Sequence, residues 1–184
     1  MVRVWVADEM RFGLKPVTRR VWTLRGREAV VPVKPGYEYG YTYGALEAGG
    51  FGGAVFMHSP TVCKDASLRF LEEITESDGV AHHIVIWDGA GFHQRAGDEG
   101  LPGNVSLITL PAYSPELNPI ERLWDIVKDG ICNRVFECVQ AAQTAVDVVL
   151  RSFWENPAKV ASLVADAWLT LPANDSNPMV YLNR

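Results

Sequence analysis

The stretch Pro111–Lys128, PAYSPELNPIERLWDIVK, carries the pattern around which the rest of the chain is organised. A proline-rich approach runs directly into a helix. Asn118 is a good N-cap for it, and Pro119 suits its first position, which needs no amide hydrogen. Apolar residues then recur at helical spacing and predict one buried stripe: Ile120, Leu123, Trp124, Val127 and Ile131. Glu121 falls on the flank of that stripe, so a rigid helix holds one carboxylate at a defined depth.

Two interpretations of Glu121 are open. In the first, the N-x-x-E pattern is a capping box, and the glutamate only closes the first helical turn. In the second, Glu121 meets Asp8, which follows the apolar run VRVWVA, and Asp88, which follows HHIVIW. Both runs are typical of buried strands. Hard oxygen ligands on rigid elements can hold two divalent ions about 4 Å apart, which is what phosphoryl transfer needs.

Two neighbouring acidic residues follow the first strand, and either could be a metal ligand. We favour Asp8 over Glu9 because its shorter side chain sits at the strand end. Side chains alternate along a strand, so Glu9 then points to the other face of the sheet.

Length and composition indicate one domain, which we place at residues 1–170. The remaining residues, 171–184, are rich in Asn, Asp, Ser and Pro and predict a loose tail. No run is long enough to span a membrane, and no signal peptide is visible. The three cysteines show no C-x-x-C spacing and suit a reducing compartment. We therefore expect a cytoplasmic protein that does not engage a membrane.

The net charge of −5 is unevenly distributed. The segment from Arg11 to Lys34 holds seven basic residues and one acidic residue, so it carries +6 and the rest of the chain −11. One interpretation is a solvated basic hairpin; the other is a patch that tracks DNA phosphates next to Asp8. The candidate DNA-binding residues are Arg11, Lys15, Arg19, Arg20, Arg25, Arg27, His93 and Lys128.

Hydrophobic periodicity predicts the remaining elements. We expect a first strand over 2–7 and a hairpin over 19–33 that turns near Arg25 and Gly26. The further strands are expected at 37–46, 54–58, 84–87 and 105–110. The further helices are expected at 64–77, at 139–154, and from 156 to Trp168 or Leu169.

Three blocks of this sequence resemble the signature blocks of DDE transposases of the mariner-type superfamily, in the bacterial insertion-sequence branch. The blocks are ADEMRFGL around Asp8, IVIWDGAGFH around Asp88, and LPAYSPELNPIERLWDIVK around Glu121. Thirty-two residues separate Asp88 from Glu121, close to the spacing typical of that superfamily. The resemblance implies an α/β, RNase H-like fold: a mixed five-stranded sheet flanked by helices, in the order strand–strand–strand–helix–strand–helix–strand–helix, with extra C-terminal helices.

The resemblance also implies a function. Asp8, Asp88 and Glu121 form the catalytic triad of that family and bind two Mg²⁺ ions, for which Mn²⁺ substitutes. The reaction is cleavage and transfer of DNA strands, the partners are transposon ends and target DNA, and the enzyme works as a homodimer at the bacterial nucleoid.

The sequence departs from the family pattern in two ways. Gly89 stands where an asparagine often follows the second aspartate. We expect the helix-turn-helix modules that precede the catalytic domain in the family to be absent, so that recognition of transposon ends is either absent or supplied by a separate DNA-binding chain. Two alternatives remain: another RNase H-like nuclease, or a truncated, non-catalytic transposase that inhibits by binding DNA or by dimerising.

Overall fold

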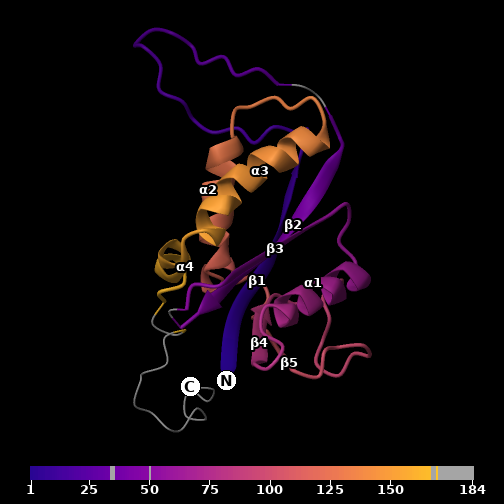
Figure 1. Cartoon of the computed structure of the whole chain (residues 1–184). Helices are drawn as coiled ribbons and strands as arrows, with labels where there is room; N and C mark the ends of the chain where they lie inside the picture. The colour runs from indigo at the N-terminus through magenta and orange to yellow at the C-terminus, as the bar shows by residue number, and fades with distance from the viewer. Residues whose placement is uncertain (34–35, 50, 167–168, 170–184) are drawn as a thin grey trace.

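The centre of the molecule is a mixed five-stranded sheet, in strand order β3-β2-β1-β4-β5, in a computed structural model (Figure 1). β1 pairs antiparallel with β2, and β2 with β3, whereas β1, β4 and β5 run parallel. The strands are β1 Val2–Gly13, β2 Tyr39–Ala48, β3 Ala54–Ser59, β4 His82–Trp87 and β5 Val105–Thr109. The structure describes residues 1–33, 36–49, 51–166 and 169.

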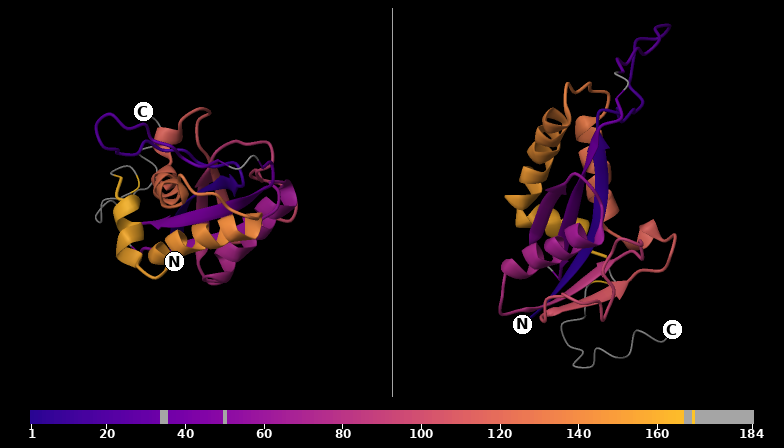
Figure 2. Two further views of the ribbon diagram at one scale, coloured as in Figure 1. Left: turned by 90° about the horizontal axis from the view of Figure 1, so that it is seen from above. Right: turned by 90° about the vertical axis from the view of Figure 1, so that its right-hand side faces the viewer.

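Helices cover both faces of the sheet (Figure 2). α1, Lys64–Glu76, packs on one face in a core with Trp5 and Ala7 of β1. The other face is covered by α2 (Ile120–Ile131), α3 (Val139–Trp154) and α4 (Pro157–Leu163). There Val6 and Met10 of β1 contribute to the core. The alternation of side chains along β1 therefore feeds two separate apolar cores.

The first strand is longer than predicted. It continues through Asp8 to Gly13, because β2 pairs with it along its whole second half, with Asp8 opposite Gly44. Asp8 therefore lies in the middle of a strand and not at its end. The expected strands at 37–46, 54–58, 84–87 and 105–110 and the helix at 64–77 are present, with ends that shift by one or two residues.

The predicted hairpin at 19–33 is wrong. The described part of residues 14–38, which we call the arm, contains no strand, and it projects away from the sheet (Figure 1). The expected turn does form: the Arg27 amide donates to the Leu24 carbonyl at 3.0 Å, and Gly26 has a φ of +85°. An isolated two-stranded ribbon is marginal in water. Since Trp22 is fully exposed, no core is present to hold this one.

Two further expectations need correction. Residues 88–104, all of them described, contain turns and no helix, so β4 and β5 are joined by a loop where the RNase H-like order has a helix. The last helix, α4, ends at Leu163 and does not reach Trp168 or Leu169. The expected tail, 171–184, lies outside the described residues.

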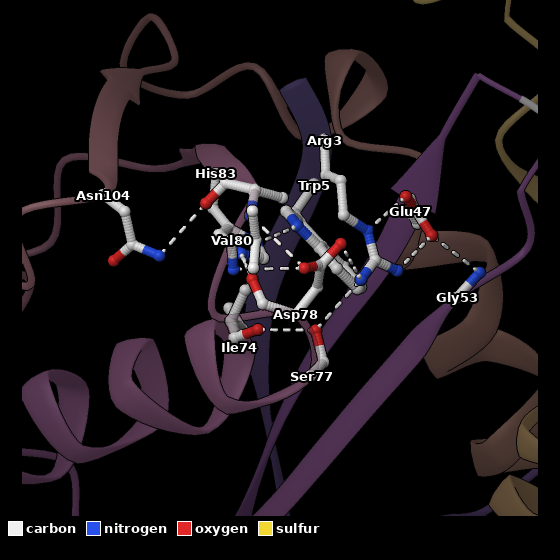
Figure 3. Close-up of polar contacts among 11 residues, drawn as sticks. Arg3, Trp5, Glu47, Gly53, Ile74, Ser77, Asp78, Val80, His83 and Asn104 are labelled. Carbon is white, nitrogen blue, oxygen red and sulfur yellow. Dashed lines mark hydrogen bonds and ion pairs between the residues drawn. The ribbon is translucent and has the colours of Figure 1, made fainter. Parts of the chain in front are cut away.

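A buried polar network joins three strands at the end of the sheet away from Asp8 (Figure 3). Arg3 of β1 makes two hydrogen bonds of 2.7 Å to the buried Glu47 of β2 and stacks over the Trp5 ring. Trp5 donates its indole N–H to His83 of β4 at 3.0 Å. Because an indole only donates, His83 accepts through Nδ1 and donates from Nε2 to the Asp78 carbonyl. The network fixes the register of the three strands.

Candidate active site

The three candidate carboxylates line one cleft of about 600 Å³. Asp8 comes from the middle of β1, Asp88 follows the last residue of β4, and Glu121 lies in the first turn of α2. The last residue of β5, Thr109, and the segment that follows it, Leu110 to Pro115, also line the cleft. The cleft therefore opens beside the carboxyl ends of β4 and β5, where parallel strands of α/β proteins commonly bind ligands.

Asp8 faces α2 because it follows Val6 in the alternation of β1. The Trp124 indole N–H donates to Asp8 Oδ2 at 2.9 Å. The Trp124 ring lies over Gly44, the strand partner of Asp8, so closely that a Cβ there would be 2.6 Å from the ring. A glycine opposite Asp8 thus provides the space that brings the tryptophan to the carboxylate.

The start of α2 is fixed directly to β1. Buried Asn118 donates from Nδ2 to the Ala7 carbonyl at 3.0 Å, and its Oδ1 lies 3.4 Å from the Ile120 amide. The helix begins at Ile120, one residue later than predicted. The Asn118 amide donates to the Pro115 carbonyl at 3.0 Å, and among the described residues the Glu121 side chain accepts no hydrogen bond from that amide; Glu121 is joined to Asn118 only through its own amide, which donates to the Asn118 carbonyl at 3.1 Å. The capping-box interpretation of Glu121 is therefore not supported.

The Asp8 carboxylate is largely withdrawn from water and has like charges around it. Burial, followed by the negative charges of Glu9 and Glu121, raises the pKa of Asp8 to about 7. The Glu9 backbone amide and the Trp124 indole act in the opposite direction by bonding the charged form. The cleft therefore holds excess negative charge close to a carboxyl group with little solvent to screen it.

Asp88 is the most exposed of the three, and its side chain is held from one side. Its Oδ1 accepts from the Ala90 amide at 3.0 Å and lies 2.9 Å from His93 Nδ1. Asp88 is 55% exposed, so these two contacts are the main restraint on its orientation.

His93 is buried and does not lie on a surface that a DNA phosphate can reach. Its Nε2 is 2.9 Å from a Glu9 oxygen, and its ring stacks on Trp87. Burial acts to lower the pKa of His93, but its hydrogen bond to Glu9 and the charges of Glu9 and Asp88 outweigh that effect, so the pKa is raised. The predicted contact with substrate phosphate is therefore replaced by contacts with two carboxylates. Glu9 points away from the cleft, as predicted from strand alternation.

The donor chemistry of the cleft fits a hard divalent cation, since all three side chains offer carboxylate oxygens. Within the described ranges, no three His, Cys, Asp or Glu side chains lie close enough together to hold a metal ion as they stand. Binding a cation there requires the carboxylates to rotate toward one another.

The basic candidates are spread over the arm and its base. Arg19 forms ion pairs with Asp129 at 2.9 Å and Asp125 at 3.2 Å, which fasten the arm to α2 and leave this guanidinium engaged. Arg11 lies over the Tyr39 ring at the end of β1. The other candidates, all exposed except the half-buried Lys128, are Lys15, Arg20, Arg25, Arg27 and Lys128. Lys34 lies outside the described residues.

Two residues of the site were not singled out from the sequence. Trp124 was assigned only to the apolar stripe, although its place one turn after Glu121 puts it on the side of the helix next to the cleft. Asn118 was expected only to cap the helix, yet it also bonds Ala7 of β1. No sequence pattern gives the strand that lies next to a helix start, so the second contact was not predictable.

The family model described as "DDE superfamily endonuclease" matches residues 3–143. An uncharacterized protein of Sinorhizobium fredii (strain NBRC 101917 / NGR234), y4pE/y4sA, is 31% identical over 134 residues, which are 71% of this chain and 96% of that protein. The match covers all three carboxylates of the cleft, because residues 3–143 include them.

Solved structures of the Mos1 transposase share the fold. The paired-end complex with the left transposon end gives a TM-score of 0.56 at 16% identity, over 89% of this chain and 55% of that one. The mariner Mos1 paired-end complex with Mg gives 0.55 at 17% identity, over 89% of this chain and 53% of that one. This chain thus spans about half the length of these relatives. The RNase H-like fold is confirmed. No helix among the described residues is long and apolar enough to cross a membrane.

Proposed function

We propose, from the premise that this chain belongs to the DDE superfamily endonuclease family, that it cleaves DNA strands and transfers them in a divalent-metal-dependent reaction. The single observation that carries the proposal is the meeting of Asp8, Asp88 and Glu121, from three separate elements, at one cleft. The outermost two of these carboxylates are 113 positions apart in the sequence, and their meeting serves no evident packing purpose, because like charges repel one another.

In this proposal Asp8 and Asp88 hold two Mg²⁺ ions, and Glu121 completes a coordination shell. When bound, the ions supply a polarised attacking oxygen and stabilise the leaving oxygen of a phosphodiester. The attacking group is water in the cleavage step and a DNA 3′-hydroxyl in the joining step. Mn²⁺ is the expected substitute for Mg²⁺, and the Mos1 complexes with Mg and with Mn are consistent with that expectation.

The side chains around the carboxylates support this role through orientation. The Trp124 indole donates to Asp8 Oδ2 and so restrains the orientation of this carboxylate at the cleft. The link from Asn118 to Ala7 keeps the first turn of α2 against β1, which sets the depth of Glu121. Both contacts are made by rigid elements, as a preorganised site requires.

DNA is the proposed partner. The arm and its base carry exposed basic side chains that suit a phosphate backbone. The arm begins after Gly13, five residues beyond Asp8, or about 17 Å along the strand at 3.3 Å per residue. A distance of about 17 Å corresponds to several nucleotides of DNA, so a strand held by the arm could extend into the cleft. Joining two DNA ends implies a homodimer.

A strand-transfer assay tests the proposal. The protein is incubated in Mg²⁺ or Mn²⁺ with a duplex that carries a pre-cut 3′ end, together with a supercoiled plasmid. Both nicked and joined products are expected. The amide variants Asp8→Asn, Asp88→Asn and Glu121→Gln should each lower the rate by at least about a hundredfold, since each removes a charged ligand at nearly constant shape.

Glu116→Gln is the matched control, because Glu116 is exposed, lies five residues from Glu121 and does not line the cleft. It should retain the wild-type rate. Nicking by Asp88→Asn at the wild-type rate would contradict the proposal.

A second candidate function is a non-catalytic transposase relative that inhibits by binding DNA or by dimerising. The observation in its favour is that no three ligands lie within metal-binding reach of one another among the described residues. This candidate predicts DNA retention without nicking, even in Mn²⁺. A nuclease that cuts without joining is recognised in the same assay by nicked plasmid in the absence of joined product.

A further inference from the structure

His93 sits between two carboxylates, that of Glu9 in β1 and that of Asp88, the residue after β4. Its Nε2 lies 3.0 and 2.9 Å from the two oxygens of Glu9. Its Nδ1 lies 2.9 Å from the Asp88 carbonyl and 2.9 Å from Asp88 Oδ1. A carbonyl oxygen only accepts, so the contact with the Asp88 carbonyl needs a proton on Nδ1, and Oδ1 lies beside the same N–H. On the Asp88 side, that proton makes His93 Nδ1 a donor.

The imidazole ring has no freedom to turn away from these contacts. It is 2% exposed and stacks on Trp87, with ring centres 4.2 Å apart and planes 3° from parallel. Phe92 packs edge-on against it, and the His93 amide donates to the Ala90 carbonyl at 3.0 Å. Glu9 is 6% exposed and keeps the ring in register by bonding Nε2. The Glu9–His93 pair is thus a rigid group.

The contacts divide the two oxygens of Asp88 between different tasks. Oδ1 accepts from the Ala90 amide and lies 2.9 Å from His93 Nδ1, whose hydrogen bond goes to the Asp88 carbonyl. Oδ2 has no hydrogen-bond partner in the part of the chain that the structure describes. Without the pair, only the Ala90 amide would restrain the exposed Asp88 carboxylate, and ordering it on binding a ligand would cost more conformational entropy.

We propose that Glu9 and His93 form a positioning pair that fixes the Asp88 carboxylate through Oδ1 and presents Oδ2 to the cation of the cleft. The proposal rests on the proposed function in that it assigns Asp88 a cation. Residues behind a metal ligand commonly contribute 10–100-fold to metal affinity or activity by orienting that ligand. Neither Glu9 nor His93 lines the cleft, so neither is a ligand in this assignment.

The competing explanation is that the pair only stabilises the core between α1 and the sheet. A double variant separates the two roles. Glu9→Leu/His93→Phe removes the donor to Asp88 but keeps an aromatic ring on Trp87. Replacing both members of a buried polar pair by apolar residues is often neutral for stability, whereas removing one member is costly. The double variant is therefore expected to fold with a melting temperature close to that of the wild type.

The first readout is Mn²⁺ affinity, measured by calorimetry on the whole chain. We expect the double variant to bind Mn²⁺ 10–100-fold more weakly than the wild type. The milder variant Glu9→Gln retains His93 and an acceptor for Nε2, and it should stay within a few-fold of the wild type. Equal Mn²⁺ affinity in the wild type and a folded double variant would overturn the positioning role.

The second readout needs neither metal nor DNA. ¹⁵N NMR of the histidine rings reports directly whether His93 Nδ1 carries a proton. A protonated Nδ1 is expected, with a resonance that moves in Asp88→Asn and keeps its place in Glu116→Gln. An unprotonated Nδ1 would overturn the proposal. If the wild type binds no Mn²⁺, the proposed function fails, while the ring spectrum still decides whether His93 holds Asp88.

Discussion

Asp8 illustrates how one side chain can lower the stability of the fold in which it functions. Its carboxylate sits against an indole and beside two other acidic groups, and burial raises its pKa to about 7 from an ordinary value of 3.8. Charging a group in such a place costs free energy. Strained or destabilised groups concentrate at functional sites because function, and not stability, keeps them there.

The consequence is a pH-dependent stability of the metal-free protein. Between about pH 4 and pH 7 the unfolded chain ionises Asp8, whereas the folded chain keeps it protonated. The unfolded state then binds fewer protons, so the free energy of unfolding falls as pH rises through this window. The difference in pKa corresponds to about 2–4 kcal/mol. Asp8→Asn should lack this loss and be the more stable protein at pH 8.

Urea denaturation in the presence of a chelator, at pH 4.5 and pH 8, measures the effect. Asp125→Asn is the control because Asp125 is exposed on α2, and its paired charge should contribute less than about 1 kcal/mol. If Asp8→Asn and the wild type lose the same stability between the two pH values, Asp8 is not the buried acid described above.

The packing of α2 on β2 depends on Gly44. The same contact brings Trp124 of α2 to Asp8 in the site. A Cβ at Gly44 would lie 2.6 Å from the Trp124 ring and 3.2 Å from Ile120. Gly44→Ala should therefore push the first turns of α2 outward, at a cost of about 1–3 kcal/mol for overpacking. The movement also separates the Trp124 indole from Asp8. Both thermal stability and strand cleavage should fall.

Gly79→Ala provides the comparison, because nothing lies within 4 Å of a Cβ at Gly79 and its φ is not positive. It should leave the melting temperature and the cleavage rate unchanged. Unaltered thermal stability and cleavage in Gly44→Ala would show that the helix does not rest on this glycine.

Most helices and strands could be predicted because their own sequences carry the signal. The stripe that includes Leu123 and Val127 has helical period and is buried as expected, and β4 is a short apolar run. The length of β1 could not be predicted in this way. Its second half reads as polar, and it is a strand because β2 pairs with it from Val4 to Gly13. The hairpin prediction for the arm failed for the opposite reason. The residues there are typical of strands, but no neighbouring strand pairs with them among the described residues.

The acidic residues of the site could be predicted in part. Strand alternation placed Asp8 and Glu9 on opposite faces, and the structure bears that out. The partners of these carboxylates were not predictable, since Trp124 and His93 reach them only through the packing of α2 and of the loop after β4. Residue type and spacing identify an acidic group; the tertiary fold decides what orients it.

The whole molecule separates its charges in space. The arm carries most of the basic excess and projects from a body with a net negative charge, so DNA held by the arm is repelled by much of the remaining surface (Figure 2). Such a distribution directs a duplex along one side of the molecule. The tip of the arm makes no ion pair among the described residues, and its cationic side chains are Arg20, Arg25 and Arg27.

The triple variant Arg20→Ala/Arg25→Ala/Arg27→Ala tests this arrangement. All three side chains are exposed, so the melting temperature should not change. Each lost phosphate contact lowers the slope of log affinity against log salt by about 0.9. The variant should therefore bind duplex DNA more weakly, and by the same factor whatever the DNA sequence. The slope of its log affinity against log salt should fall by up to about 3. Fluorescence anisotropy over a salt series provides the measurement.

The matched control removes the same charge from the body of the protein: Arg69→Ala/Arg95→Ala/Lys159→Ala. If the two triple variants lose affinity equally, only net charge matters, and the position of the arm carries no meaning. If only the arm variant loses affinity, and its salt slope falls with it, the arm contacts phosphates directly. Because the arm starts about 17 Å from Asp8, a bound duplex would then extend from the arm toward the cleft, and cleavage would depend on both.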